Sequence, residues 1–161
     1  MAYQWDSYLE TGFERIDSRH KELISALNNI ISAFRRGKGR EELYKTLYFL
    51  TGYTAMLFSY EEELMIENSY PGFPSHKHCH DEFSETVENL ARQLIDDGPS
   101  DDLVITVTTT IGNWLLNHIR IDDFNMAFYV KSKEIQALYP IDEFPYMSHI
   151  DNNHTLLHNT G

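Results

Sequence analysis

The sequence predicts an all-α protein, an up-down-up-down four-helix bundle with an N-terminal extended arm and a C-terminal tail. Four long segments carry apolar residues at helical spacing. The breaks between these segments are short and rich in glycine, proline or acidic residues. Helices joined by such short connections pack antiparallel to their neighbours, so four of them close around one core.

Length and charge narrow the kind of protein. A chain of 161 residues can bury one hydrophobic core without disulfides, and Cys79 is its only cysteine. The 13 basic and 25 acidic side chains give a net charge of −12, which repels nucleic acid and anionic membrane surfaces. The start "MAYQWDSYLE" lacks a signal-like pattern, and no run of 18 uncharged apolar residues occurs. We therefore expect a cytoplasmic protein with no nucleic-acid or membrane partner.

The arm and the first helix meet near residue 18. Residues 3–17 show scattered aromatic side chains without a sustained period, so we expect an extended arm lying over the bundle. The first helix is expected over residues 18–37, with Asp17 or Ser18 as its cap and two glycines after it. Its apolar stripe comprises Leu23, Ile24, Leu27, Ile30, Ile31 and Phe34.

The second and third helices flank a proline-rich turn. The second helix is expected over residues 40–67, and the turn is "NSYPGFP". Ser75 is the expected cap of the third helix, which runs to about Ile95 and ends at "DDGPSDD". The stripe of the second helix comprises Leu43, Leu47, Leu50, Thr54, Leu57, Glu61 and Leu64.

The fourth helix is expected from about Ser100 to about Val130. Its stretch "LVITVTTTI" is β-branched and favours a strand by local propensity, but the three long helices before it favour a fourth. The sequence after it is polar and contains prolines, which is typical of a loosely held tail. We therefore predict one bundle domain over residues 1–131, including the arm, and a tail over residues 132–161.

A histidine-rich stretch, "FPSHKHCHDEF", opens the third helix. His76 and His80 are four residues apart, which leaves them about 40° apart around a helix, so one metal ion can contact both. His78 and Cys79 point in other directions. Alone, such a pair is more often part of a solvated helix face than a metal site.

The other helices also place ionisable residues beside their apolar stripes. These residues are His20, Glu61, His118, Asp122 and Asp123. Buried carboxylates and imidazoles are costly unless they neutralise one another or bind a cation. Iron, manganese and zinc accept this mixture of ligands, and the lack of thiolates argues against a structural zinc site.

Four spaced motifs resemble the bacterial hemerythrins, which are four-helix proteins with a non-haem di-iron site. The motifs are "WDSYLETGFERIDSRHKEL", "FSYEEELM", "YPGFPSHKHCHDEF" and "WLLNHIRIDDFNMAF", and together they cover about residues 5 to 128 in the family's order. The resemblance implies two non-haem iron ions joined by an oxo or hydroxo bridge. It also implies reversible binding of dioxygen for delivery, storage or sensing, and no catalytic residue.

Carried over by position, the resemblance assigns a ligand set. One iron would take His76, His80 and His118, and Glu61 and Asp123 would bridge the two metals. The other iron would take His20.

The choice between Asp122 and Asp123 conflicts with ideal helix geometry. A straight helix places Asp123 about 140° from His118 and Asp122 only about 40° away. The family spacing selects Asp123, and Asp122 is kept as the weaker candidate. A local widening of the fourth helix, which is common at functional sites, would reconcile the two.

The chain departs from the family at Leu57. The family has a histidine at this position, four residues before the bridging glutamate, as a ligand of the second iron. Either water fills the gap and a weaker, more reactive di-iron centre survives, or one ion remains on the three-histidine side. The alternatives are therefore a di-iron oxidase or peroxidase using the open position, and a single-metal or metal-free interaction module.

Neighbouring residues have simpler interpretations. Trp114, Phe83 and Leu57 are candidates to wall the metal pocket, although Trp114 also fits a plain core position. Glu62 and Glu63 are expected on a solvated face.

Overall fold

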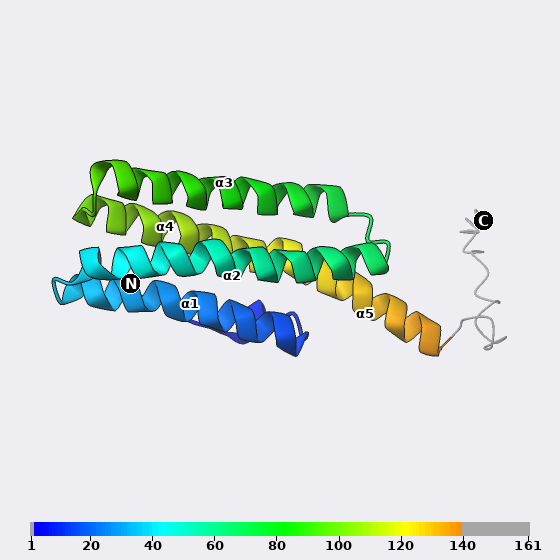
Figure 1. Ribbon diagram of the computed structural model, residues 1–161. Helices are drawn as coiled ribbons and strands as arrows, with labels where there is room; N and C mark the ends of the chain where they lie inside the picture. The colour runs from blue at the N-terminus through cyan, green and yellow to red at the C-terminus, as the bar shows by residue number, and fades with distance from the viewer. Residues whose placement is uncertain (1, 140–161) are drawn as a thin grey trace, which may run out of the picture.

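The computed structural model describes residues 2–139. Its elements are η1 (Ser7–Leu9), α1 (Glu14–Arg35), α2 (Gly39–Glu67), α3 (Phe73–Asp97), α4 (Asp101–His118), the π-helical turn η2 (Ile119–Asp123) and α5 (Phe124–Leu138). Figure 1 shows the long helices side by side, with α5 continuing α4. Each helix packs against the next, and α4 also packs against α1. The predicted all-α four-helix bundle is confirmed.

The N-terminal arm is fixed to the bundle by hydrogen bonds. The backbone N–H of Tyr3 donates to Oδ1 of Asn28 on α1 at 2.8 Å, and the Tyr3 hydroxyl donates to the carbonyl of Thr108 on α4 at 2.7 Å. The arm is therefore held across α1 and α4, as expected, although a short helical turn interrupts it.

The first helix begins earlier than predicted. It starts at Glu14. Asp17 does not cap it, because the Asp17 carboxylate accepts hydrogen bonds from the backbone N–H groups of Thr11 and Gly12 at 2.8 and 3.0 Å. The turn needs glycine, since Gly12 has a φ of +74°. The predicted glycine stop is confirmed, because Gly37, with a φ of +73°, follows the end of α1.

The third helix also begins slightly before its predicted cap. It starts at Phe73 with proline in its first turn, where the missing N–H costs little. Ser75 does not cap it, since its hydroxyl instead donates to the carbonyl of Gly72 at 2.9 Å.

The β-branched stretch in α4 is helical, as the bundle context predicts. Ser100 caps α4 by accepting a hydrogen bond from the backbone N–H of Leu103 at 3.0 Å. Val104, Val107 and Ile111 are each no more than 1% exposed. Burial of these side chains against the other helices outweighs their weak local preference for a strand.

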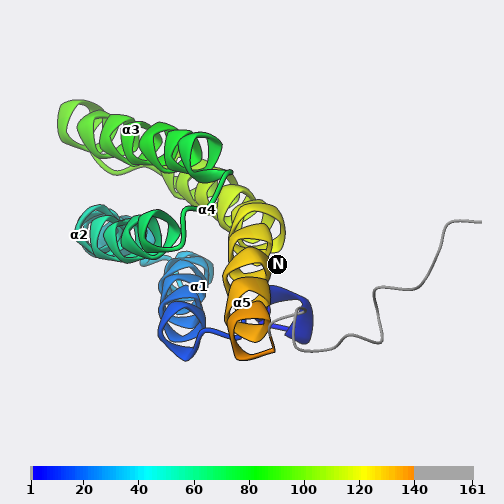
Figure 2. The ribbon, with the colours of Figure 1, turned by 90° about the vertical axis from the view of Figure 1, so that its right-hand side faces the viewer.

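The last helix continues to Leu138, beyond the predicted end at Val130. Figure 1 shows this extension projecting past the ends of the neighbouring helices, and Figure 2, seen from that end, places α5 beside α1. Residues 140–161, which make up most of the predicted tail, lie outside the described residues. Among the described helices, none combines the length and apolarity needed to cross a membrane.

Candidate metal centre

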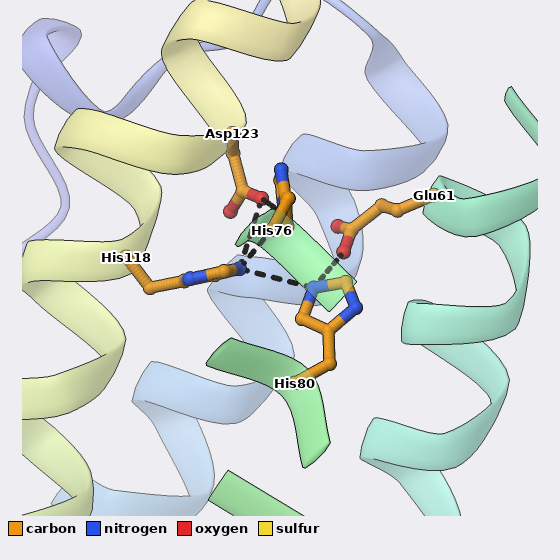
Figure 3. A group of neighbouring side chains, drawn as sticks. All are labelled: Glu61, His76, His80, His118 and Asp123. Atoms are coloured by element: carbon orange, nitrogen blue, oxygen red, sulfur yellow. Dashed lines mark hydrogen bonds and ion pairs between the residues drawn. The ribbon is translucent and has the colours of Figure 1, made fainter. Parts of the chain in front are cut away.

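All six predicted ligands lie together inside the bundle. Four of them, His20, Glu61, His80 and Asp123, are at most 1% exposed. The group draws on every long helix and on the π-helical turn: α1 supplies one residue, α2 one, α3 two, α4 one and η2 one. Figure 3 shows five of these side chains pointing toward a common point. A buried polar group of this size requires mutual neutralisation or a cation.

Three imidazoles form one side of the centre. Nε2 of His118 lies 3.1 Å from Nε2 of His76 and 3.1 Å from Nε2 of His80. The spacing of His76 and His80 by one helical turn brings both to the same target, as the sequence predicted. Three ring nitrogens directed at one point are a typical metal-binding arrangement for imidazole.

Two carboxylates lie between these imidazoles and His20. Oδ1 of Asp123 is 3.2 Å from Nε2 of both His76 and His118, and its Oδ2 is 3.2 Å from Nε2 of His20. Glu61 has one oxygen 3.2 Å from Nε2 of His80 and the other 3.6 Å from Nε2 of His20. Each carboxylate therefore touches both sides of the centre.

The π-helical turn explains how Asp123 reaches this position. Residues Ile119–Asp123 form a π-helix, so the chain turns less per residue there than in an α-helix. Oδ2 of Asp122 instead lies 3.2 Å from Nδ1 of His118, on the outer side of that ring. The predicted widening of the fourth helix is confirmed.

Without a cation the centre is an array of ion pairs. Burial opposes charge on His20, but its contacts with Asp123 and Glu61 outweigh burial and raise the pKa of His20 to about 9. In the same way, Asp123 and Asp122 overcome the effect of burial and raise the pKa of His118 to about 10. Burial would raise the pKa of Asp123, yet His118, His20 and His76 hold it well below its usual range.

The arrangement fits a metal better than it fits a proton network. Both oxygens of Glu61 and both oxygens of Asp123 are buried without a hydrogen bond of acceptable geometry within the described chain. The buried oxygens of Glu61 and Asp123 point toward a shared centre and not along the directions that hydrogen bonds would take. A cation at that centre would satisfy the inward-facing oxygens and nitrogens together.

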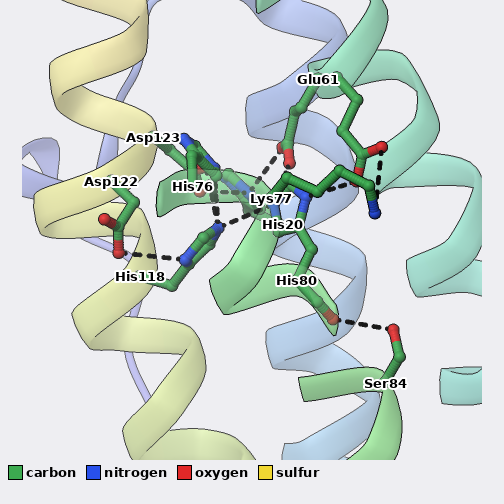
Figure 4. A network of polar contacts seen from close by, with 10 residues as sticks. His20, Glu61, His76, Lys77, His80, Ser84, His118, Asp122 and Asp123 are labelled. Atoms are coloured by element: carbon green, nitrogen blue, oxygen red, sulfur yellow. Dashed lines mark hydrogen bonds and ion pairs between the residues drawn. The ribbon is translucent and has the colours of Figure 1, made fainter. Parts of the chain in front are cut away.

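Two further carboxylates support the imidazoles from outside. Oε1 of Glu62 lies 3.1 Å from Nδ1 of His80, and Lys77 lies 3.9 Å from the other Glu62 oxygen. Figure 4 shows Asp122 in the corresponding place against His118. Such outer carboxylates fix the tautomer of a metal-binding histidine and increase its basicity. The expectation that Glu62 belongs to a solvated face is wrong, whereas Glu63 is exposed as expected.

Aromatic rings cover the three-histidine side. Trp114 stacks on His118 with ring centroids 4.3 Å apart, and Phe83 stacks on Trp114 at 4.0 Å. Phe58 stacks on His80 at 3.9 Å, a contact that the sequence motifs did not indicate. These rings exclude water from one side of the centre.

The remaining residues of the histidine-rich stretch face away from the centre. His78 is exposed and pairs with Glu82 at 3.4 Å. Burial raises the pKa of the Cys79 thiol, with nearby Asp122 acting in the same direction, so the thiolate is disfavoured. The exposed position of His78 agrees with the predicted direction of its side chain.

Comparisons with known proteins agree with this geometry. The family model described as "Hemerythrin HHE cation binding domain" matches residues 11–127. A bacteriohemerythrin from Stenotrophomonas maltophilia is 31% identical over 128 residues, covering 80% of this chain and 81% of that protein. A myohemerythrin from Theromyzon tessulatum is 28% identical over 122 residues, covering 76% of this chain and 88% of that protein. The crystal structure of a hemerythrin point mutant aligns with a TM-score of 0.70 at 25% identity, covering 81% of this chain and 98% of that one. The chain belongs to the hemerythrin family.

Proposed function

We propose that this protein binds dioxygen at a non-haem di-iron centre, for storage, delivery or sensing. The observation that carries the proposal is the convergence of four imidazoles and two carboxylates on one buried point. The mixed nitrogen and oxygen ligand set suits iron. Family membership supports the same function, since the relatives include bacteriohemerythrins and myohemerythrins.

The ligands divide into two sets under this proposal. His76, His80 and His118 would hold one iron, and His20 would hold the other. Glu61 and Asp123 would bridge the two, which agrees with their contacts to both sides of the centre. An oxo or hydroxo group would complete the bridge. The iron pair would supply two electrons to dioxygen as it binds and would recover them as it leaves.

The surrounding residues prepare the centre for that task. Glu62 and Asp122 keep Nε2 of His80 and His118 directed inward by engaging the opposite ring nitrogens. Trp114 and Phe58 cover the two rings and limit the access of water and protons. Exclusion of water favours release of dioxygen over its further reduction.

Leu57 makes the second iron site the weaker one. It lies one turn before Glu61 on α2 and is 1% exposed. By the resemblance of the motifs, it stands where the family would have a histidine. Tyr53 does not offer a replacement, because its hydroxyl is hydrogen-bonded to Glu22 at an exposed position. The second iron would therefore keep one imidazole and the shared carboxylates, and it would leave coordination positions open.

Iron content and absorption test the proposal together. The metal-free protein is loaded with ferrous iron without oxygen, and iron per chain and the near-ultraviolet and visible spectrum are recorded before and after air. We expect more than one iron per chain and new absorption after exposure to air. His80→Ala should lose both. His78→Ala removes the same kind of ring from the same helix at a solvent-exposed position, and it should lose neither. Equal losses in both variants, or an iron-loaded protein that stays colourless after exposure to air, would contradict the proposal.

A single-metal protein is the second candidate. One observation favours it: ligand atoms of Glu61, His76, His80, His118 and Asp123 all lie within 4.8 Å of one another, and His20 is not part of that group. This set alone can complete the coordination of one ion. One tightly bound metal per chain, with no second uptake at excess iron, would select this candidate. Sustained turnover of peroxide with an added reductant would instead select an oxidase or peroxidase.

A further inference from the structure

An apolar stripe runs along α5 on the side that faces away from the core. It consists of Phe124, Phe128, Ile135, Leu138 and, directly after the helix, Tyr139. These residues are 49%, 67%, 60%, 74% and 64% exposed, respectively. The first four follow a spacing of four, seven and three residues, which keeps them within about 80° of one another around a helix. This is the spacing of a helix that packs against another helix.

The opposite side of α5 holds the helix in place. Met126, Ala127 and Val130 are buried. The Tyr129 hydroxyl donates to the carbonyl of Ser69 at 3.2 Å. Lys133 donates to the carbonyl of Asn68, in the same turn, at 2.7 Å. The orientation of the apolar stripe toward solvent is therefore fixed by contacts on the other face.

A lysine, Lys131, lies on the same side of α5 as the apolar stripe, but its charged end is bound elsewhere in the chain. Lys131 falls between Phe128 and Ile135 at the next position of the repeat, but its ammonium group donates to the carbonyl of Thr11 at 2.9 Å and lies 5.1 Å from the centre of the Phe13 ring. Both partners belong to the N-terminal arm. The charge of Lys131 is thus engaged within the chain and does not interrupt the apolar stripe.

Hollows border the stripe where it meets the arm. One, of about 310 Å³, is lined by residues that include Gly12, Phe124 and Phe128. A second, of about 550 Å³, lies between Tyr8, Arg120 and Phe124. Side chains of a facing helix can enter such hollows while the stripe packs against that helix.

Charge and area favour a second copy of this chain as the partner. The chain carries a net charge of −12, whereas α5 contains two lysines and one glutamate, a net charge of 2 − 1 = +1. Copies that meet through α5 therefore avoid bringing their acidic surfaces together. The exposed parts of the five stripe residues amount to roughly 700 Å², close to the roughly 800 Å² that each partner contributes to a standard interface.

We propose that the apolar stripe of α5 is the interface of a symmetric homodimer. The same stripe on both copies would pack helix against helix around a two-fold axis, with the side chains of one entering the spaces of the other. The dimer would bury part of the last turns of α5, which are exposed in the single chain. It does not depend on the metal centre or on its occupancy.

Sedimentation of the full chain tests the dimer. Across roughly 1 to 100 μM, the range in which a dimer with a micromolar dissociation constant assembles, we expect a mass that rises from 18.9 kDa toward twice that value. Phe128→Glu combined with Ile135→Glu should raise the dimer dissociation constant at least tenfold. Ile95→Glu is the matched control, since Ile95 is an exposed isoleucine, 76% exposed, on α3. This control should leave the dissociation constant unchanged.

Circular dichroism and metal content accompany these measurements, so that loss of fold is distinguished from loss of association. A full chain that stays monomeric at the highest concentration would overturn the proposal, and so would a dimer that the stripe variants do not weaken. If removal of residues 140–161 converts such a monomer into a dimer, the tail of the same chain is the occupant and the homodimer is excluded for the full chain.

Discussion

His118 and Asp123 are five residues apart on one continuous helical run, yet Nε2 of His118 lies 3.2 Å from Oδ1 of Asp123. The π-helical turn between them makes this contact, and it leaves Asp122 on the outer side of His118, 3.2 Å from Nδ1. Two adjacent aspartates therefore receive different tasks. Asp123 faces the proposed metals, and Asp122 orients one of their ligands.

The two aspartates predict different mutant phenotypes. Asp123→Asn removes a proposed bridging charge and should abolish binding of at least one metal per chain. Asp122→Asn should keep the stoichiometry and weaken affinity by about 10- to 100-fold, the usual effect of losing an outer carboxylate. Zinc affinity measured by competition with a chelator distinguishes the two. The assignment is wrong if Asp122→Asn changes the stoichiometry and Asp123→Asn does not.

Glu62 offers a second test of the outer carboxylates. Because Glu62 lies 3.1 Å from Nδ1 of His80, Glu62→Gln should weaken zinc binding by about 10- to 100-fold. Glu63→Gln removes the same charge from the next residue, which is exposed, and should change affinity less than about threefold. Similar effects in the two variants would show that net charge, rather than ligand orientation, matters here.

Leu57→His tests the weakness of the second iron site. The new imidazole would stand one turn before Glu61 and add a ligand on the His20 side. We expect the second iron to bind at least tenfold more tightly and the oxygenated form to last longer before autoxidation. Leu57→Met, which conserves volume without adding a strong ligand, is the control. If histidine and methionine give the same iron uptake and oxygen reactivity, Leu57 does not mark a missing ligand.

The raised histidine pKa values predict how the metal-free protein responds to alkali. The pKa values of His20 and His118 are about 9 and about 10 in the folded chain, above the ordinary value of 6.5. Their stabilising contribution is thus fully present below about pH 6.5 and is lost as pH rises through about 9 to 10. The urea midpoint of chelator-treated protein should fall over that range.

Zinc-loaded protein is the control for this pH dependence. Its histidines are neutral ligands and have no proton to lose, so its midpoint should fall less over the same range. Lysine and tyrosine side chains ionise in both forms and cancel in the comparison. Parallel curves for the two forms would contradict protonation of the metal-free centre.

The sequence carries enough information for the bundle because each helix repeats its apolar pattern over many turns. Even the β-branched stretch of α4 could be assigned as helical, because the three long helices before it favour a fourth that completes the bundle. The start of α1 could not be placed, because Asp17 is equally suited to cap a helix and to bind a loop. Only the folded loop shows that it does the latter.

The candidate site shows the same division. The resemblance of the motifs to the hemerythrins was sufficient to select the six side chains that the structure brings together, including Asp123 against ideal helix geometry. Glu62 could not be recognised, because its contact with His80 depends on how α2 and α3 are aligned. Phe58 was missed for the same reason: an apolar residue in a helical pattern carries no sign that it will stack on an imidazole.

Anomalous diffraction at the iron absorption edge, from crystals of the iron-loaded protein, tests the central claim most directly. The account predicts a strong peak in contact with Nε2 of His76, His80 and His118. A second, weaker peak should lie beside His20, with Glu61 and Asp123 between the two. Iron bound elsewhere, or a buried centre that stays free of iron at saturating metal, would contradict it.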